Sequence, residues 1–306
     1  MKAMILAAGL GTRLRPFTKF LPKALMPIGN KPLLDYHLDT LEKLGVHEVI
    51  INVHHHATAI GKHLAKSSRV GIRVTLSYEE DLLGTGGALA KVRSFFEGER
   101  QFLVVNSDLW HIFDLRSALA WSSSSDAPAT LIVQPLENKH DIPGALNTDK
   151  NGWITRVPDM RINARARHWK FTGLHIMTPV VLDALTNEMR GCIVRVGYRK
   201  MIEKGKPPNI YFPPFSPWWD VGTPEGLLAA NLHHLADGKS LIAPDANIEP
   251  GAILGPQVII GSGSTVSRGA HLSRTVVLGG SHVPEGTWLD RSIVSPQYTV
   301  TMRKVR

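Results

Sequence analysis

Short apolar runs alternate with segments of helical periodicity over the first hundred residues. The first run, residues 1–7, ends at a glycine-rich turn, and apolar residues then recur at helical spacing between Leu33 and Leu44. The same pattern predicts further strands at 49–53, 74–78 and 101–105, with helices at 57–66 and 87–96. Alternating strands and helices form a parallel sheet, which binds ligands beyond the carboxyl ends of its strands. We therefore expect the turns after Ala7 and Val105 to face one crevice.

The pattern becomes strand-rich in the middle of the chain. Strands are expected at 129–134, 144–147, 153–156 and 171–177, where they extend the sheet as a second wall of the crevice. The first 238 residues are therefore predicted to form one α/β domain. Its fold is expected to be Rossmann-like, with a mixed, mainly parallel sheet flanked by helices.

From Leu241 onward, an aliphatic residue followed by Gly or Pro recurs about every six residues. This rhythm is typical of a hexapeptide β-helix, so residues 239–306 are predicted to form a short left-handed β-helix domain. A short β-helix has open ends and flat faces that another copy can cover, so we expect a homo-oligomer and an assembly or regulatory role for this domain. The aliphatic residues expected to point into it are Ile248, Ile253, Val258, Ile260 and Val266.

Composition narrows the class of protein. The single cysteine, Cys192, excludes a disulfide framework and a multi-cysteine zinc site, and it fits a reducing, cytoplasmic location. No stretch has roughly twenty apolar residues, so no membrane span is expected. The net charge of +9 suggests an anionic partner. Because nucleic-acid-binding motifs are lacking, small phosphorylated substrates fit better than nucleic acid, with an ordinary solvated basic surface as the alternative.

The turn after the first strand has the composition of a phosphate site. Gly9 and Gly11 let backbone amides approach phosphate oxygens, and Arg13 adds a forked cation. The Rossmann fingerprint would need a small residue where Leu14 stands, and a P-loop would need Gly-Lys-Ser/Thr, so both common phosphate motifs are excluded.

A longer set of motifs is more specific. The segments 6–16 and 22–27 resemble the opening pattern of the sugar-1-phosphate nucleotidyltransferases, also called nucleotide-sugar pyrophosphorylases. The segments 83–89, 105–108 and 219–231 resemble later motifs of that family, in the same order. The resemblance covers about the first 235 residues, and hexapeptide tails occur in many members.

This resemblance implies attack by a sugar 1-phosphate oxygen on the α-phosphorus of a nucleoside triphosphate, with pyrophosphate leaving. Asp108 and Asp220 are the natural Mg²⁺ ligands, because Mg²⁺ binds one or two carboxylates together with phosphate oxygens and water. Arg13 is expected to hold the β- and γ-phosphates, and Lys23 to reach the α-phosphate in the transition state.

The resemblance also implies substrate-binding segments. Glu79 and Asp81 are interpreted as solvated loop acids as readily as binding residues. The residues expected to bind the nucleotide are Ala7, Ala8, Gly9, Gly11, Thr12, Glu80, Gly84 and Thr85, and those expected to face the sugar are Gly144, Thr172 and Gly173.

The sequence departs from the family at two places. Ser107 stands where members usually have glycine, and residues 157–161 replace a Glu-Lys-Pro element whose lysine holds the sugar phosphate. The histidines at 54–56 are interpreted as structural or solvated, because adjacent side chains cannot all converge on one ion. The cations that could replace the missing lysine are Arg161, Arg165, Arg167, Lys170 and Arg199.

The substrates stay open between two pairs. The hexapeptide tail favours GTP with mannose 1-phosphate, and the surroundings of Trp110 and 171–173 resemble uridylyltransferases that act on N-acetylmuramate or glucose 1-phosphate. A non-catalytic regulatory subunit is a second class of protein, which the full set of catalytic candidates disfavours. A hexapeptide acyltransferase would need more coils and a catalytic histidine than His271 and His282 supply.

Overall fold

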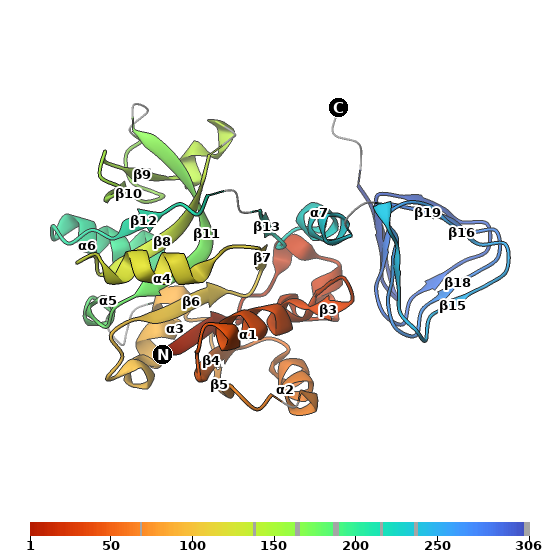
Figure 1. Cartoon of the computed structure of the whole chain (residues 1–306), viewed down its shortest axis with the longest axis horizontal. Helices are drawn as coiled ribbons and strands as arrows, with labels where there is room; N and C mark the ends of the chain where they lie inside the picture. The colour runs from red at the N-terminus through yellow and green to blue at the C-terminus, as the bar shows by residue number, and fades with distance from the viewer. Residues whose placement is uncertain are drawn as a thin grey trace. The chain divides into compact units, whose positions relative to one another are not determined.

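The chain forms two compact units, which are described separately. The computed structural model describes residues 1–67, 69–136, 139–162, 166–185, 190–214, 217–235 and 238–302. The first unit contains residues 1–9, 37–107 and 111–218, and the second contains residues 10–36, 108–110 and 219–306. Each unit is therefore built from segments that are far apart in the sequence (Figure 1).

A mixed sheet of nine described strands forms the centre of the first unit (Figure 1). The strands are β1 (Lys2–Leu6), β4 (Glu48–Val53), β5 (Arg73–Tyr78), β6 (Phe102–Asn106), β8 (Ala129–Pro135), β9 (Leu146–Thr148), β10 (Ile154–Arg156), β11 (Arg167–Met177) and β12 (Asn209–Tyr211). Their order is β10-β9-β11-β6-β1-β4-β5, with β8 paired to β11 and β12 paired to β8. The neighbours β6, β1, β4 and β5 are parallel, whereas β11 runs antiparallel to β6, β8 and β9. This confirms the expected Rossmann-like α/β fold.

Helices connect and flank these strands. They are α1 (Leu33–Lys43), α2 (Ala57–Lys66), α3 (Gly84–Lys91), α4 (Leu115–Ser123), α5 (Val180–Asp183) and α6 (Arg199–Glu203), the last of which follows a π-helical stretch, Ile193–Tyr198. The helix predicted at 87–96 begins three residues earlier and ends at Lys91, before a 3₁₀ turn at Arg93–Phe96. Tertiary hydrogen bonds explain the early start, because Gly86 N donates to Gly191 O. No helix in the described part of the chain is long and apolar enough to cross a membrane.

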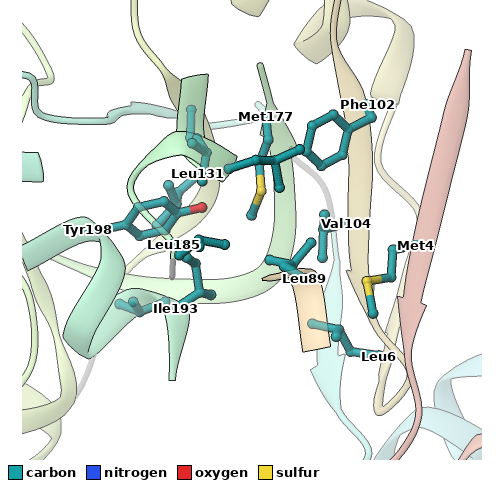
Figure 2. Close-up of a cluster of buried hydrophobic side chains, with 14 of the residues drawn as sticks. Met4, Leu6, Leu89, Phe102, Val104, Leu131, Met177, Leu185, Ile193 and Tyr198 are labelled. Carbon is teal, nitrogen blue, oxygen red and sulfur yellow. The ribbon is translucent and has the colours of Figure 1, made fainter. Parts of the chain in front are cut away.

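The core of the first unit supports the strand ends that carry the predicted motifs. Met4 and Leu6 of β1 lie near Val104 of β6 and Leu89 of α3 (Figure 2). The Phe96 and Phe102 rings stack with centroids 3.9 Å apart. Burial of each large apolar side chain stabilises the fold by about 1.5–3 kcal/mol, so β1 and β6 form a firm base for the turns that follow them.

The second unit contains residues 10–32, here called the signature segment, together with helix α7 (Pro224–His234) and the β-helix. Two short hairpin strands, β2 (Pro27–Ile28) and β3 (Lys31–Pro32), end the signature segment. Helix α7 begins at Thr223, whose hydroxyl accepts a hydrogen bond from Gly226 N at 3.1 Å, with proline at the first helical position. Strands β7 (Leu109–His111) and β13 (Trp218–Asp220) pair beside the two predicted metal aspartates.

The tail is a parallel β-helix of three faces, which appears as a triangle in Figure 1. One face stacks β14 (Leu241–Ile242), β17 (Ile259–Ile260), β20 (Val276–Val277) and β23 (Ser292–Val294), and β24 (Thr299–Thr301) adds to it antiparallel. The second face stacks β15 (Asn247–Ile248), β18 (Thr265–Val266) and β21 (His282–Val283). The third stacks β16 (Ile253–Leu254), β19 (His271–Ser273) and β22 (Trp288–Asp290). This agrees with the predicted hexapeptide fold.

The faces of the β-helix differ in how their outer sides are covered. On the first face, neighbouring residues are both apolar and both buried: Val277 packs into the interior, and Val276 packs into a cluster with Phe17, Met26 and Leu227. On the third face, Ile253 points outward and is 52% exposed, so the prediction that it points inward was wrong. Leu254 packs on the interior instead, because successive residues of a strand point to opposite sides.

Candidate functional site

The signature segment of the second unit is folded as short 3₁₀ turns. These turns are Thr12–Leu14, Phe17–Lys19 and Lys23–Leu25. Gly11 adopts the left-handed conformation with φ +62°, and Thr18 donates a hydroxyl hydrogen bond to its carbonyl at 2.8 Å. A Cβ at position 11 would lie 2.8 Å from Cγ2 of Thr18, so both the backbone angle and the close packing require glycine. The loop is thus tightly folded around its second glycine.

Two cations of this segment meet the two predicted metal aspartates within the second unit. Arg13 Nη1 lies 3.1 Å from Oδ2 of Asp220, and Arg13 Nη2 lies 3.8 Å from Oδ2 of Asp108. Lys23 Nζ donates to the same Asp108 oxygen. The Arg13 side chain is 59% exposed, whereas those of Lys23 and Asp108 are each 18% exposed. All four predicted catalytic residues therefore form one partly open cluster of alternating charge.

Glycines make room for this cluster. A Cβ on Gly222 would lie 2.7 Å from both Arg13 Nη2 and Asp220 Oδ1, and 3.2 Å from Asp108 Oδ2. Gly222 N also donates to Asp220 Oδ1 at 2.8 Å, which orients that carboxylate. A Cβ on Gly226 would collide with the Asp220 carbonyl oxygen. Gly222 is a site residue that the sequence analysis does not single out, although its place two residues after Asp220 in a turn motif is a signal for it.

The paired carboxylates have the chemistry that a divalent metal ion requires. One oxygen of Asp108 and one of Asp220 both lie next to Gly222, and carboxylate oxygens are the hard ligands that divalent ions such as Mg²⁺ prefer. The described residues contain no group of three or more His, Cys, Asp or Glu side chains that could hold a metal. The protein would therefore supply two carboxylates, and phosphate oxygens and water would complete the coordination.

The turn predicted to approach phosphate begins in the first unit at the end of β1. Ala7 and Ala8 are buried and Gly9 is exposed, with open space where its Cβ would be. Ala7 N donates to Asn52 Oδ1 at 2.8 Å, so this amide is held by the protein itself. The end of the neighbouring strand β6 is held against the end of β1, because Ser107 N donates to Leu6 O.

The acids after β5 differ sharply in exposure. Glu80, the predicted binding residue, is exposed, whereas Glu79 is 1% exposed. Of the two interpretations left open for Glu79, the solvated loop acid is therefore wrong. Glu79 is buried because its carboxylate accepts hydrogen bonds from Asn52 Nδ2 and Leu83 N. His54 donates through Nδ1 to the Glu79 carbonyl at 2.8 Å, which is the structural role expected for that histidine.

The Gly84–Thr85 segment is fixed by a second loop of the first unit. Gly84 has φ +71°, and a Cβ there would lie 2.6 Å from Gly191 O. The Thr85 hydroxyl accepts a hydrogen bond from Ile193 N at 2.8 Å. Residues of this region, including Glu80 and Leu83, line a cleft of about 830 Å³. The close packing at Gly84 and the hydrogen bond to Thr85 thus fix this segment between Leu83 and Gly87, two residues that line the cleft.

The predicted sugar-facing residues lie on two elements of the first unit. Gly173 has φ +92° at an irregularity in the pairing of β11 with β8, and the Thr172 hydroxyl is buried and donates to Ile132 O. Gly144 is exposed at the end of a 3₁₀ turn. Buried Arg156 donates to the carbonyls of Pro143 and Ala145, the two neighbours of Gly144. Burial lowers the pKa of Arg156. Sequence reasoning missed this arginine.

The cations considered as replacements for the missing lysine differ in setting. Lys170 Nζ lies 5.0 Å from the centre of the Trp218 ring, and Trp218 Nε1 donates to Thr172 O. Arg199 pairs with Glu203 of its own helix at 2.9 Å. Arg161 and Arg167 are exposed, and Arg165 lies outside the described residues. Lys170 thus adjoins the predicted sugar segment, because Trp218 contacts both Lys170 and Thr172.

Known protein families match both the residues of the candidate site and the tail. A family model described as nucleotidyl transferase matches residues 2–237, and a model of the GMPPB C-terminal domain matches residues 236–304. Mannose-1-phosphate guanyltransferase beta-A of Xenopus laevis is 31% identical, over 96% of this chain and 86% of its own length. Mannose-1-phosphate guanyltransferase of Neurospora crassa is 30% identical, over 98% of this chain and 87% of its own.

Solved structures show the same fold. HddC from Yersinia pseudotuberculosis has a TM-score of 0.61 at 22% identity, over 75% of this chain and 97% of its own. A putative glucose-1-phosphate thymidylyltransferase from Bacillus anthracis has a TM-score of 0.64 at 21% identity, over 76% of this chain and 95% of its own.

Proposed function

Because this chain belongs to the nucleotidyl transferase family and is a sugar-1-phosphate nucleotidyltransferase, we propose that it joins GTP to mannose 1-phosphate and releases pyrophosphate. The convergence of Arg13, Lys23, Asp108 and Asp220 in one cluster carries the proposal that this chain is catalytic. Relatives named mannose-1-phosphate guanyltransferase support the choice of substrates, because the match extends over both the catalytic region and the tail. The product would be GDP-mannose.

The cluster suits transfer between two polyanions. A sugar phosphate is already an anion at neutral pH, so the reaction needs alignment and charge neutralisation rather than a strong base. Lys23, held against Asp108, would contact the α-phosphate and stabilise the charge that develops there. The more exposed Arg13 would bind the β- and γ-phosphates together with the amides of Gly9, Gly11 and Thr12.

Asp108 and Asp220 would hold the magnesium ion. Mg²⁺, when bound there, would neutralise phosphate charge during transfer. Gly222 keeps the space next to both carboxylates free of a side chain and orients Asp220 through its amide. The residues of the chain thus supply two anionic ligands and two cations around the position of the reacting phosphates.

The other predicted binding residues belong to the first unit. The backbone at Ala7, Ala8, Glu80, Gly84 and Thr85 is proposed to receive the nucleotide, because it borders the carboxyl ends of parallel strands. The sugar is proposed to meet Gly144, Thr172 and Gly173 through backbone groups, since the Thr172 hydroxyl is buried and already bonded. Lys170 is the proposed replacement for the missing sugar-phosphate lysine, because it adjoins this segment.

We propose that the chain has two domains, divided between residues 238 and 239, just before the hexapeptide rhythm begins. Residues 1–238 would form the catalytic domain and residues 239–306 the hexapeptide β-helix domain. We propose a homo-oligomer that works in the cytoplasm on small-molecule substrates, without a nucleic-acid or membrane partner. The single cysteine and the open outer face that includes Ile253 and Trp288 support this view.

A pyrophosphate-release assay over a matrix of triphosphates and sugar 1-phosphates tests the substrate assignment. We expect the highest kcat/KM with GTP and mannose 1-phosphate. A clear preference for UTP with N-acetylmuramate or glucose 1-phosphate would assign the chain as a uridylyltransferase instead. Binding of a nucleotide sugar without turnover on any pair would identify a regulatory subunit and overturn the catalytic proposal.

A further inference from the structure

Two polar side chains are buried side by side at one end of the parallel sheet in the first unit. Asn52, on β4, is 4% exposed, and Glu79, just after β5, is 1% exposed. In the ladder, Asn52 is aligned with Leu6 of β1 and with Ser77 of β5. It therefore lies on the strand between the two strands whose following turns carry the predicted nucleotide contacts.

A continuous chain of hydrogen bonds runs through this pair. Ala7 N donates to Asn52 Oδ1 at 2.8 Å, Asn52 Nδ2 donates to Glu79 Oε1 at 2.8 Å, and Leu83 N donates to Glu79 Oε2 at 3.1 Å. The backbone amides of Ala7 and Leu83 are thus joined through two side chains: the Asn52 amide, which accepts one bond and donates the next, and the Glu79 carboxylate, which accepts at both oxygens. The order of donors and acceptors is unambiguous, because both ends of the chain are backbone N–H groups.

The backbone of Glu79 is held as firmly as its side chain. Its amide donates to Val53 O at 2.8 Å, and its carbonyl accepts from His54 Nδ1 at 2.8 Å. Glu79 also lines the cleft of about 830 Å³ together with Glu80 and Leu83. Movement of Glu79 would therefore displace both the wall of this cleft and, through Asn52, the turn that begins at Ala7.

We propose that Asn52 and Glu79 are positioning residues that hold the Ala7–Gly9 turn and the Leu83–Thr85 turn at the spacing required for the nucleoside triphosphate. The proposal rests on the nucleotidyltransferase activity and is independent of which base or sugar the enzyme uses. Both side chains are nearly inaccessible, and their polar atoms bond to each other and to the two backbone amides. Their effect on catalysis passes through the two backbone turns that they tie together.

An exchange of the amide and the carboxylate between positions 52 and 79 tests the proposal. Glu79→Gln turns an N–H group toward either Asn52 Nδ2 or Leu83 N, and Asn52→Asp opposes two acceptors at the centre of the chain. The double variant Asn52→Asp/Glu79→Gln restores every bond. In it, the new carboxylate at position 52 accepts from Ala7 N and from the new side-chain amide at position 79, whose oxygen accepts from Leu83 N. We expect each single variant to lower kcat/KM for the preferred triphosphate at least about tenfold, mainly through KM, and the double variant to recover to within about threefold of the wild type.

Thr130→Val is the matched control. Thr130 is fully buried in the same sheet and donates to Asn209 Oδ1 at 2.7 Å, away from both turns. We expect it to lower the unfolding temperature without raising the triphosphate KM. Binding of Mg·GTP and Mg·UTP, measured by calorimetry, follows the same variants independently of turnover.

Two outcomes would overturn the positioning role. One is a double variant that binds and uses triphosphate no better than the weaker single variant, and the other is a Thr130→Val enzyme whose KM rises as much as that of Glu79→Gln. If a single variant does not fold, the double variant still decides, because it should fold and turn over. A wild-type protein without any turnover would contradict the enzymatic assignment instead. The binding of Mg·GTP and Mg·UTP to the variants would still test the positioning role of Asn52 and Glu79.

Discussion

The Arg13 guanidinium lies 3.1 Å from Oδ2 of Asp220, a residue 207 positions further along the chain. The same guanidinium approaches Asp108, which Lys23 also contacts. Two cations and two carboxylates thus share one region of the second unit, although the sequence separates them into three motifs. Neutralisation of a polyphosphate requires such a meeting of cations with metal-binding anions.

Both aspartates should be essential for turnover. Asp108→Asn and Asp220→Asn each remove an anionic ligand for Mg²⁺, so we expect kcat to fall at least about a hundredfold in either variant. Pyrophosphate release at several magnesium concentrations measures the effect, and the unfolding temperature controls for misfolding. Turnover near the wild-type value in a folded variant would refute the metal assignment.

Lys23 and Arg13 should differ in their kinetic effects. Lys23 is mostly buried beside Asp108 and is proposed to act at the α-phosphate, so Lys23→Ala should reduce kcat more than it raises the nucleotide KM. Arg13 is more exposed and is proposed to bind the terminal phosphates, so Arg13→Ala should change both constants. Steady-state kinetics with varied triphosphate distinguish the two. An unchanged kcat in the lysine variant would contradict the assigned roles.

The buried His175 should make the first unit sensitive to acid. Burial lowers the pKa of His175 from 6.5 to about 3, and its Nδ1 lies 2.7 Å from the Tyr198 hydroxyl. Below pH 6.5 the unfolded chain binds a proton at this histidine that the folded chain does not. Its contribution to stability is therefore complete above pH 6.5 and declines by about 1.4 kcal/mol per pH unit between 6.5 and 3.

Urea unfolding at about pH 7, 6 and 5 measures this slope. His175→Gln does not titrate in the range, so the variant should show a shallower loss of unfolding free energy, by about one proton. An equal slope in both proteins would mean that burial does not keep His175 neutral in the folded chain.

The outer side of the first β-helix face should matter to the signature segment. Val276 packs in the cluster with Leu14 and Phe17, whereas its neighbour Val277 points into the β-helix interior. Val276→Ala and Val277→Ala remove the same atoms and should each destabilise the protein by about 1–3 kcal/mol. Because only Val276 supports the segment that carries Arg13 and Lys23, we expect only Val276→Ala to lower turnover, by about threefold or more. Equal turnover in the two variants, assayed well below their unfolding temperatures, would contradict this coupling.

Several features of the protein follow from its sequence alone. Apolar periodicity predicts β1, β4, β5 and β6 and the six-residue rhythm of the tail, because burial of one side of each element demands these spacings. The signature motifs also single out Arg13, Lys23, Asp108 and Asp220. Charge and geometry restrict which residue types can serve phosphate transfer, so such motifs are legible without a structure.

Tertiary structure decided which of two neighbouring residues is buried and what it bonds. Glu79 and Glu80 are identical in type, yet only Glu79 meets Asn52 and Leu83 N. Ile253 and Leu254 both suit a core, yet the strand's alternation turns only Leu254 inward. A hydrogen-bond partner or a covering surface comes from distant segments, and its position depends on how the strands align in space. Local pattern therefore determines the elements and the chemistry of this protein, and tertiary packing determines the contacts that orient them.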